Sequence, residues 1–399
     1  MTSPDQRLAD YARLAVRVGA NVQPGQLVAV NGLVEHAPLA RAVAREAYAA
    51  GARYVDAQYR DEHVRRAMIE AAPDETLLWS PPWSVARARA LGEEGAAIVS
   101  ITGNPEPELF AGLDESRVGR AWPRELAQET LKLSNGLANW TIVSYPTEGW
   151  ARTVFGEPDL ERLWQAVATC VRLDEPDPVA AWQQHIGTLE ARAQAMDDRR
   201  FDALRFRGPG TDLTIGLFPQ TRWQAALDES SSGIRHVANM PTEEIFTSPD
   251  PARTEGVVRS TRPLQIGGTV VRDLEIRFEA GRAVAVDAAS GADVMREHIQ
   301  ADEGAPRLGE VALVDGESRV GRTGLVFFDT LFDENATCHI ALGEGISVSY
   351  EGDADGKLNS SSIHTDFMIG GPEVEVDAVA TGGEVVPLLR GDVWQLPTR

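Results

Sequence analysis

The periodicity of the apolar residues changes near residue 195, and this change constrains the fold more than any other feature of the chain. Before it, short β-branched runs such as LVAVNG (27–32) and AAIVSITG (96–103) alternate with longer stretches rich in Ala, Arg and Leu, such as APLARAVAREAYAAGA (37–52). Strands that alternate with helical patterns indicate βαβ units and a mainly parallel sheet. We therefore predict an α/β N-terminal domain over residues 1–195.

After residue 195 the pattern is that of β-hairpins. Two alternating runs flank a Gly-Pro-Gly turn in FDALRFRGPGTDLTIGLF (201–218), and similar pairs occupy 274–291 and 374–394. A short helical pattern, ADVMREHI, covers 292–299. Hairpins with few helices predict a mixed α+β, strand-rich C-terminal domain over residues 196–399.

Composition excludes several classes of function. The 399 residues are 43% hydrophobic, which suffices for two packed cores, and the formal net charge of −22 repels nucleic-acid phosphates and anionic membrane surfaces. The chain has neither a long apolar run nor a signal-peptide pattern, so we expect no membrane partner and a cytoplasmic location. Two cysteines, Cys170 and Cys338, are too few for a disulfide framework or a four-cysteine zinc site.

The segment HTDFMIGG (364–371) places His364 and Asp366 two positions apart in an otherwise apolar run. In a strand, residues two apart project from the same face, so the imidazole and the carboxylate would share one space. Such a pair suits a divalent cation. A chance surface pair or a plain hydrogen bond is the alternative explanation.

Other polar residues of the same half are candidate partners. His339 lies in the apolar stretch NATCHIALG (335–343), Glu243 and Glu244 follow a proline in NMPTEEIFTSPD (239–250), and Glu310 opens a strand pattern in RLGEVALVD. Each also has a structural explanation: a buried, hydrogen-bonded histidine, solvated loop charges, and a surface residue at a strand entry.

Four segments in order resemble the aminopeptidase T and aminopeptidase S family of thermophilic-type metallo-aminopeptidases. They are NMPTEEIFTSPD, LGEVALVDGESRVG, TGLVFFDTLFDENATCHIALGEG and NSSSIHTDFMIG, and the N-terminal VQPGQLVAV is also similar. The resemblance implies five metal ligands, which fall on Glu244, Glu310, His339, His364 and Asp366. It also implies a homodimer that acts on small peptides with a free N-terminus.

Three carboxylates and two imidazoles suit two adjacent divalent ions that share a bridging carboxylate, either Asp366 or one of the glutamates. Such a pair can hold one water and lower its pKa towards neutrality. We expect zinc first, with cobalt, manganese or magnesium as alternatives for this mixed donor set. Glu243, beside the predicted ligand Glu244, is the candidate general base, and a solvent-facing side chain is the alternative.

One position departs from the family pattern. The family has a tyrosine seven residues after the histidine, where this chain has Ile346, and Tyr350 could replace it only if the loop is rearranged. A catalytically degenerate metal-binding or peptide-binding protein is therefore the alternative to an aminopeptidase. A hydrolase for a non-peptide amide is a third possibility, whereas Cys338 and His339 are adjacent and point apart in a strand, which disfavours a thiol hydrolase.

Overall fold

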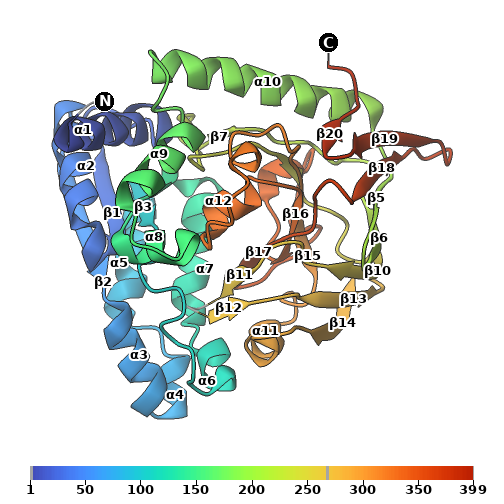
Figure 1. Cartoon of the computed structure of the whole chain (residues 1–399), viewed down its shortest axis with the longest axis horizontal. Helices are drawn as coiled ribbons and strands as arrows, with labels where there is room; N and C mark the ends of the chain where they lie inside the picture. Colours follow the sequence, from blue (N-terminus) through green and yellow to red (C-terminus); the bar gives the residue numbers. More distant parts are fainter. Residues whose placement is uncertain (1–2, 267–268, 399) are drawn as a thin grey trace.

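The computed structural model describes residues 3–266 and 269–398, and its N-terminal region is built on a parallel sheet (Figure 1). Four strands lie in the order β2-β1-β3-β4, and every pair is parallel. This confirms the α/β prediction for the first half. The strands are β1 (Leu27–Leu33), β2 (Tyr54–Arg60), β3 (Ala97–Thr102) and β4 (Asn139–Ser144).

Helices cover both faces of this sheet because successive strand residues point to opposite sides. Val28 and Val30 of β1 pack in one cluster with residues of α1 and α2, whereas Ala29 packs with residues of α5 on the other face. The helices of this region are α1 (Pro4–Leu14), α2 (Ala37–Ala49), α3 (Glu62–Ala71), α4 (Asp74–Leu77), α5 (Pro82–Glu93), α6 (Glu115–Arg120), α7 (Arg124–Lys132), α8 (Glu148–Phe155) and α9 (Leu160–Cys170).

A long helix, α10 (Pro178–Arg199), leads from the first region to the second and runs along the top of the molecule in Figure 1. It begins where Asp177 accepts a hydrogen bond from the backbone of Ala180, and it ends at Arg200 in the left-handed conformation. The predicted boundary near residue 195 falls inside this helix, and the division into 1–195 and 196–399 stays a prediction. Among the described residues, no helix is long and apolar enough to cross a membrane.

The C-terminal region is strand-rich, as predicted, and its larger sheet is antiparallel throughout. Eight strands lie in the order β14-β13-β10-β6-β5-β18-β19-β20. The predicted Gly-Pro-Gly turn joins β5 to β6, and these two strands pair with each other. The strands are β5 (Ala203–Gly208), β6 (Thr211–Gly216), β10 (Thr254–Arg259), β13 (Glu275–Glu279), β14 (Arg282–Asp287), β18 (Glu375–Val379), β19 (Val385–Arg390) and β20 (Val393–Trp394).

A second antiparallel sheet, with the order β17-β16-β15-β9, shares a hydrophobic core with the larger one. Its strands are β9 (Ile245–Thr247), β15 (Leu308–Leu313), β16 (His339–Gly343) and β17 (His364–Met368), and α12 (Thr330–Glu334) precedes β16. Two short ribbons, β7 (Leu227–Glu229) with β8 (Arg235–Val237) and β11 (Leu264–Ile266) with β12 (Thr269–Val271), and the helix α11 (Ala292–His298) complete this region.

Candidate metal centre

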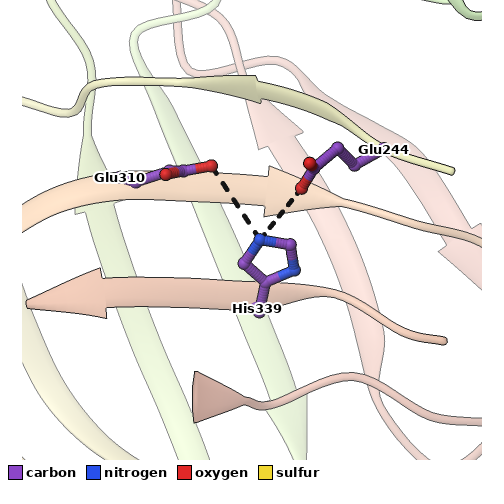
Figure 2. Close-up of side chains that lie close together, drawn as sticks. All are labelled: Glu244, Glu310 and His339. Carbon is purple, nitrogen blue, oxygen red and sulfur yellow. Dashed lines mark ion pairs between the residues drawn. The ribbon is translucent and has the colours of Figure 1, made fainter. Parts of the chain in front are cut away.

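Every predicted metal ligand lies on or beside the four-stranded sheet. Glu244 precedes β9, Glu310 lies in β15 and His339 opens β16, while His364 and Asp366 both lie on β17. In Figure 2 the carboxylates of Glu244 and Glu310 point towards one ring nitrogen of His339. Segments separated by more than a hundred residues therefore bring their polar side chains together on one side of this sheet.

The sequence of β16 makes room for this cluster. His364 pairs with Gly343 and Asp366 pairs with Ala341, so the residues opposite the β17 ligands are small. Ile340 and Leu342, the alternate residues of β16, belong to the hydrophobic core. One face of the strand thus packs in the core, while its other face carries His339 and leaves space around the ligands.

The donor atoms form two groups with one residue in common. His339 Nε2 lies 3.0 Å from Glu244 Oε2 and 3.9 Å from Glu310 Oε1. His364 Nε2 lies 3.0 Å from Glu310 Oε2 and 3.5 Å from Asp366 Oδ1. Within each group, one donor atom from each of the three residues lies within 4.8 Å of the others. Glu310 belongs to both groups, and its two oxygens face different histidines.

Both histidines are oriented by a backbone carbonyl. His339 Nδ1 lies 3.0 Å from the carbonyl oxygen of Glu334, and His364 Nδ1 lies 2.9 Å from that of Glu344. A carbonyl only accepts hydrogen bonds, so each Nδ1 carries a hydrogen, and in the neutral ring Nε2 presents a lone pair. Metal-binding histidines in proteins are held in this way.

In this orientation the Nε2 lone pair of each neutral imidazole faces a carboxylate oxygen. A cation bound between them would remove the repulsion between the lone pairs. Glu244 Oε2 is buried and has no hydrogen-bond partner within the described part of the chain, although His339 Nε2 is close to it. A neutral imidazole and a carboxylate cannot satisfy each other at this contact, because both offer only lone pairs. A divalent cation between them would accept both, so the donor set fits a metal ion.

The electrostatics of the cluster also favour cations. Burial lowers the pKa of His339, but the neighbouring carboxylates, Glu244 first, outweigh this effect and raise it to about 10. Burial raises the pKa of Glu310, which His364 opposes. Without ions, the imidazoles would therefore be protonated, because the negative charge around them stabilises the imidazolium form. A bound metal ion would take the place of these protons.

The structure adds Glu334, which the sequence analysis missed. This residue ends α12 and is 6% exposed, and within residues 3–266 and 269–398 its carboxylate receives only long contacts of 3.4 Å from the amides of Asn239 and Asn335. Burial and the charges of Asp366 and Glu244 raise the pKa of Glu334 well above its usual value. Its carboxyl group therefore lies within electrostatic reach of the donor groups, and without cations burial and these charges favour its protonated, neutral form. The apolar surroundings of the phrase LFDENATCHIALG were the signal that this acid is buried.

Glu243, the candidate general base, lies in a different environment. Its Oε1 accepts a hydrogen bond from Arg172 Nη2 at 2.9 Å, and its Oε2 lies 3.5 Å from His185 Nε2. It belongs to neither donor group. The side chain is buried rather than solvent-facing, and a catalytic role for it stays a prediction that these contacts do not support.

The two residues considered for the missing tyrosine flank one short 3₁₀ turn, Ser347–Ser349. Tyr350 packs edge-on against Phe218, with 5.4 Å between the ring centroids, and its backbone forms a bridge with Thr221. Ile346 is held through its backbone: its N–H donates to the hydroxyl of Ser248, and its carbonyl accepts from the hydroxyl of Ser349. The ring of Tyr350 thus packs against Phe218, and its replacement of the family tyrosine stays a prediction that this contact does not support.

Cys338 does not form a nucleophile–base pair with His339. Its thiol contacts the backbone of Val314, and burial raises its pKa to about 12. These contacts do not support a thiol nucleophile at Cys338.

Carboxylates and imidazoles clustered in this way on one sheet fit a metal-dependent enzyme, and comparison with known proteins gives the family. Residues 4–394 match the family described as thermophilic metalloprotease (M29). Aminopeptidase T of Thermus aquaticus is 41% identical over 98% of both chains, and aminopeptidase AmpS of Bacillus subtilis is 35% identical over 99% of this chain and all of its own. The solved structure of wild-type AmpT from Thermus thermophilus, 40% identical, superposes with a TM-score of 0.85 over 98% of this chain and 99% of its own.

The chain therefore belongs to the M29 family of metallopeptidases. It is a peptidase, and membership of this family implies dependence on a divalent metal. The resemblance noted in the sequence is confirmed over nearly the whole length.

Proposed function

We propose that this protein is a dinuclear metallo-aminopeptidase that removes N-terminal residues from small peptides with a free N-terminus. The observation that carries this proposal is the pair of donor groups that share Glu310. Two metal ions with a common carboxylate are a recurrent arrangement in aminopeptidases. The names of the relatives, aminopeptidase T and aminopeptidase AmpS, support cleavage at the N-terminal end of the peptide.

Each ion would have its own set of protein ligands. Glu244 and His339 would hold the first, with Glu334 as a further oxygen donor, and His364 and Asp366 would hold the second. Glu310 would bridge them, which selects one of the three carboxylates considered from the sequence. Glu244, Glu310 and Glu334 are buried and Asp366 is partly buried, and two divalent cations would balance the charge of these four carboxylates in their ionised form.

The ions, when bound, would supply an activated water and a Lewis acid for the scissile carbonyl. The protein's own residues set the conditions for this chemistry. The carbonyls of Glu334 and Glu344 hold both imidazoles in one tautomer, so that each Nε2 is available as a ligand. The negative charge of the cluster would attract the positively charged amine of a peptide, which favours cleavage next to a free N-terminus.

Zinc is the metal we propose first, because mixed imidazole and carboxylate sets suit it, and cobalt, manganese or magnesium remain alternatives. A homodimer, which the family resemblance implies, is also a proposal, and sedimentation equilibrium of the purified protein tests it.

The competing proposal is a degenerate site that binds metal or peptide without turnover, and it rests on Ile346 in place of the family tyrosine. The five ligand positions are all present and together, which favours the enzyme.

Hydrolysis of leucyl-p-nitroanilide, measured beside its N-acetylated form, tests the proposed function. The purified protein is assayed after EDTA treatment and after re-addition of each divalent ion. We expect activity that disappears with EDTA, returns with metal and requires the free amine. Two bound ions without turnover of either compound would contradict the substrate assignment, and hydrolysis of the acetylated form would contradict the exopeptidase assignment.

A further inference from the structure

A buried ion pair joins the end of α9 to the segment that carries Glu244. Arg172, two residues after α9, is 4% exposed and donates to Glu243, which is 5% exposed. The guanidinium lies over the ring of Trp182, 5.0 Å from its centroid. The backbone of Arg172 has a φ of 62°, a left-handed conformation that costs free energy in a residue with a side chain. Packing and the ion pair must hold this arrangement in place.

Contacts from three parts of the chain hold the segment before Glu244. Glu243 pairs with Arg172 through its side chain, and its backbone N–H donates to Asn335 Oδ1 at 2.7 Å. The carbonyl of Thr242 accepts from His185 Nε2 of α10 at 2.8 Å. Burial, followed by the nearby Arg172 charge, lowers the pKa of His185 to about 3, so the ring is a neutral donor at neutral pH. The contacts come from the end of α9, from α10 and from the residue that follows α12.

The end of α9 and the loop that follows it have a second set of contacts with the C-terminal region. Arg319 donates to the carbonyl of Thr169 at 3.2 Å and to Asp174 at 2.8 Å, and it also pairs with Glu175. The loop after α9 thus receives one ion pair from Glu243 and others from Arg319. Both partners belong to the C-terminal region, so this contact fixes the N-terminal region against the segment that bears the metal ligand.

Neighbouring residues of an extended segment project to opposite sides, and the two glutamates follow this rule. Glu243 points to Arg172, while Glu244 points to His339. We infer that Glu243 is a positioning residue, whose buried pair with Arg172 holds Glu244 at the first metal site and thereby links the docking of the α9 loop to retention of one ion. This inference rests on the proposed two-ion site.

The positioning role differs from general-base catalysis in what it predicts for metal binding. A positioning residue changes the affinity for the ion that Glu244 holds, whereas a proton carrier changes turnover and leaves metal affinity intact. The second ion, held by His364 and Asp366, is an internal reference because neither of these residues contacts Glu243.

The experiment measures two metal dissociation constants and the unfolding midpoint for the full chain. Apoprotein is titrated with Co²⁺ and with Zn²⁺ against a competing chelator, for the wild type, Arg172→Met and Glu243→Gln. We expect Arg172→Met to increase the dissociation constant of one ion by about 10- to 100-fold, the usual effect of removing a residue that orients a ligand. The dissociation constant of the other ion should stay within about threefold of the wild-type value. Glu243→Gln keeps an acceptor for Arg172 and should act in the same direction but less strongly.

Asp377→Asn is the matched control. Asp377 is 1% exposed, pairs with Arg207 at 2.6 Å and with Arg390 in the eight-stranded sheet, and belongs to neither donor group. The substitution Asp377→Asn removes a buried carboxylate, so it should lower the unfolding midpoint without changing either metal dissociation constant. If Arg172→Met does not fold, Glu243→Gln alone decides the question.

Three results would overturn the inference: unchanged metal affinity with reduced turnover in Glu243→Gln, equal weakening of both ions, or the same weakening in Asp377→Asn. Failure of the proposed function is distinguishable, because a wild type that binds two ions but cleaves no peptide would still permit this measurement.

Discussion

The carboxylate of Glu310 faces the imidazole of His364, with 3.0 Å between Oε2 and Nε2. Its other oxygen lies 3.9 Å from Nε2 of His339 on the neighbouring strand. One side chain on β15 therefore reaches both histidines. This relationship distinguishes Glu310 from Glu244 and Asp366, each of which belongs to only one donor group.

Replacement of Glu310 should affect both ions, while replacement of His364 should affect one. Glu310→Gln keeps the size of the side chain but loses its charge, so we expect it to retain neither ion after dialysis and to lose more than about 100-fold in kcat/KM. His364→Ala should retain the ion held by Glu244 and His339. Elemental analysis of the dialysed proteins measures the stoichiometry, with exposed Glu373→Gln as the control. Loss of a single ion in Glu310→Gln would exclude a bridging role.

Removal of the metals should lower the stability of the folded protein. The apoprotein lacks the positive charge of the ions beside Glu244, Glu310 and Asp366, and an ion that binds only the folded state contributes about 2.7 kcal/mol at a concentration 100 times its dissociation constant. We expect the unfolding midpoint to fall with EDTA and to rise with the logarithm of added metal. A midpoint that does not respond to metal would mean that the cluster binds no ion in the folded state.

The sequence predicted the ligands better than their arrangement. The spacing of His364 and Asp366 in a strand predicted that they share a face, and the structure places both at the centre. The role of Glu310 as the common residue depends on the register of β15, β16 and β17, which long-range packing sets and local pattern does not contain.

The directions of two acidic side chains could not be predicted from the sequence. Glu243 was chosen because it is next to Glu244, but its direction depends on Arg172, which lies 71 residues earlier in the chain. Glu334 was overlooked because its carboxylate reaches the centre from the end of a five-residue helix, too short for a periodic pattern. Both cases concern the direction of a side chain rather than the choice of element.

Restoration of the family tyrosine at position 346 should improve the metal site. The loop around Ile346 is held through its backbone by Ser248 and Ser349, so the side chain can change without loss of these contacts. We expect Ile346→Tyr to tighten metal binding or raise kcat by about 3- to 10-fold, the effect of one additional hydrogen bond. Tyr350→Phe is the control and should alter neither quantity, because that ring packs on Phe218. No change in Ile346→Tyr would show that the substitution is neutral.

Asp329 provides a prediction about pH at the contact between the two regions. It accepts a hydrogen bond from the backbone of Gly103 at 3.0 Å and one from Ser144 at 3.4 Å, both at the ends of parallel strands. Burial, followed by the charge of Asp333, raises the pKa of Asp329 from 3.8 to about 7. The folded state therefore binds this proton more tightly than the unfolded state does.

A raised carboxyl pKa makes a stabilising contribution that is complete below pH 3.8 and disappears as the pH rises through about 7. The amount lost is on the order of 4 kcal/mol, from about three units at 1.36 kcal/mol each. Asp329→Asn stays neutral, so its stability relative to the wild type should increase from pH 4 to pH 8. Denaturant unfolding of both proteins at each pH measures this difference, and the contributions of bound metal cancel in it. Exposed Asp353→Asn should show no such trend. A difference for Asp329→Asn that stays constant over this range would mean that Asp329 is ionised in the folded protein throughout, and that Gly103 and Ser144 stabilise its charge.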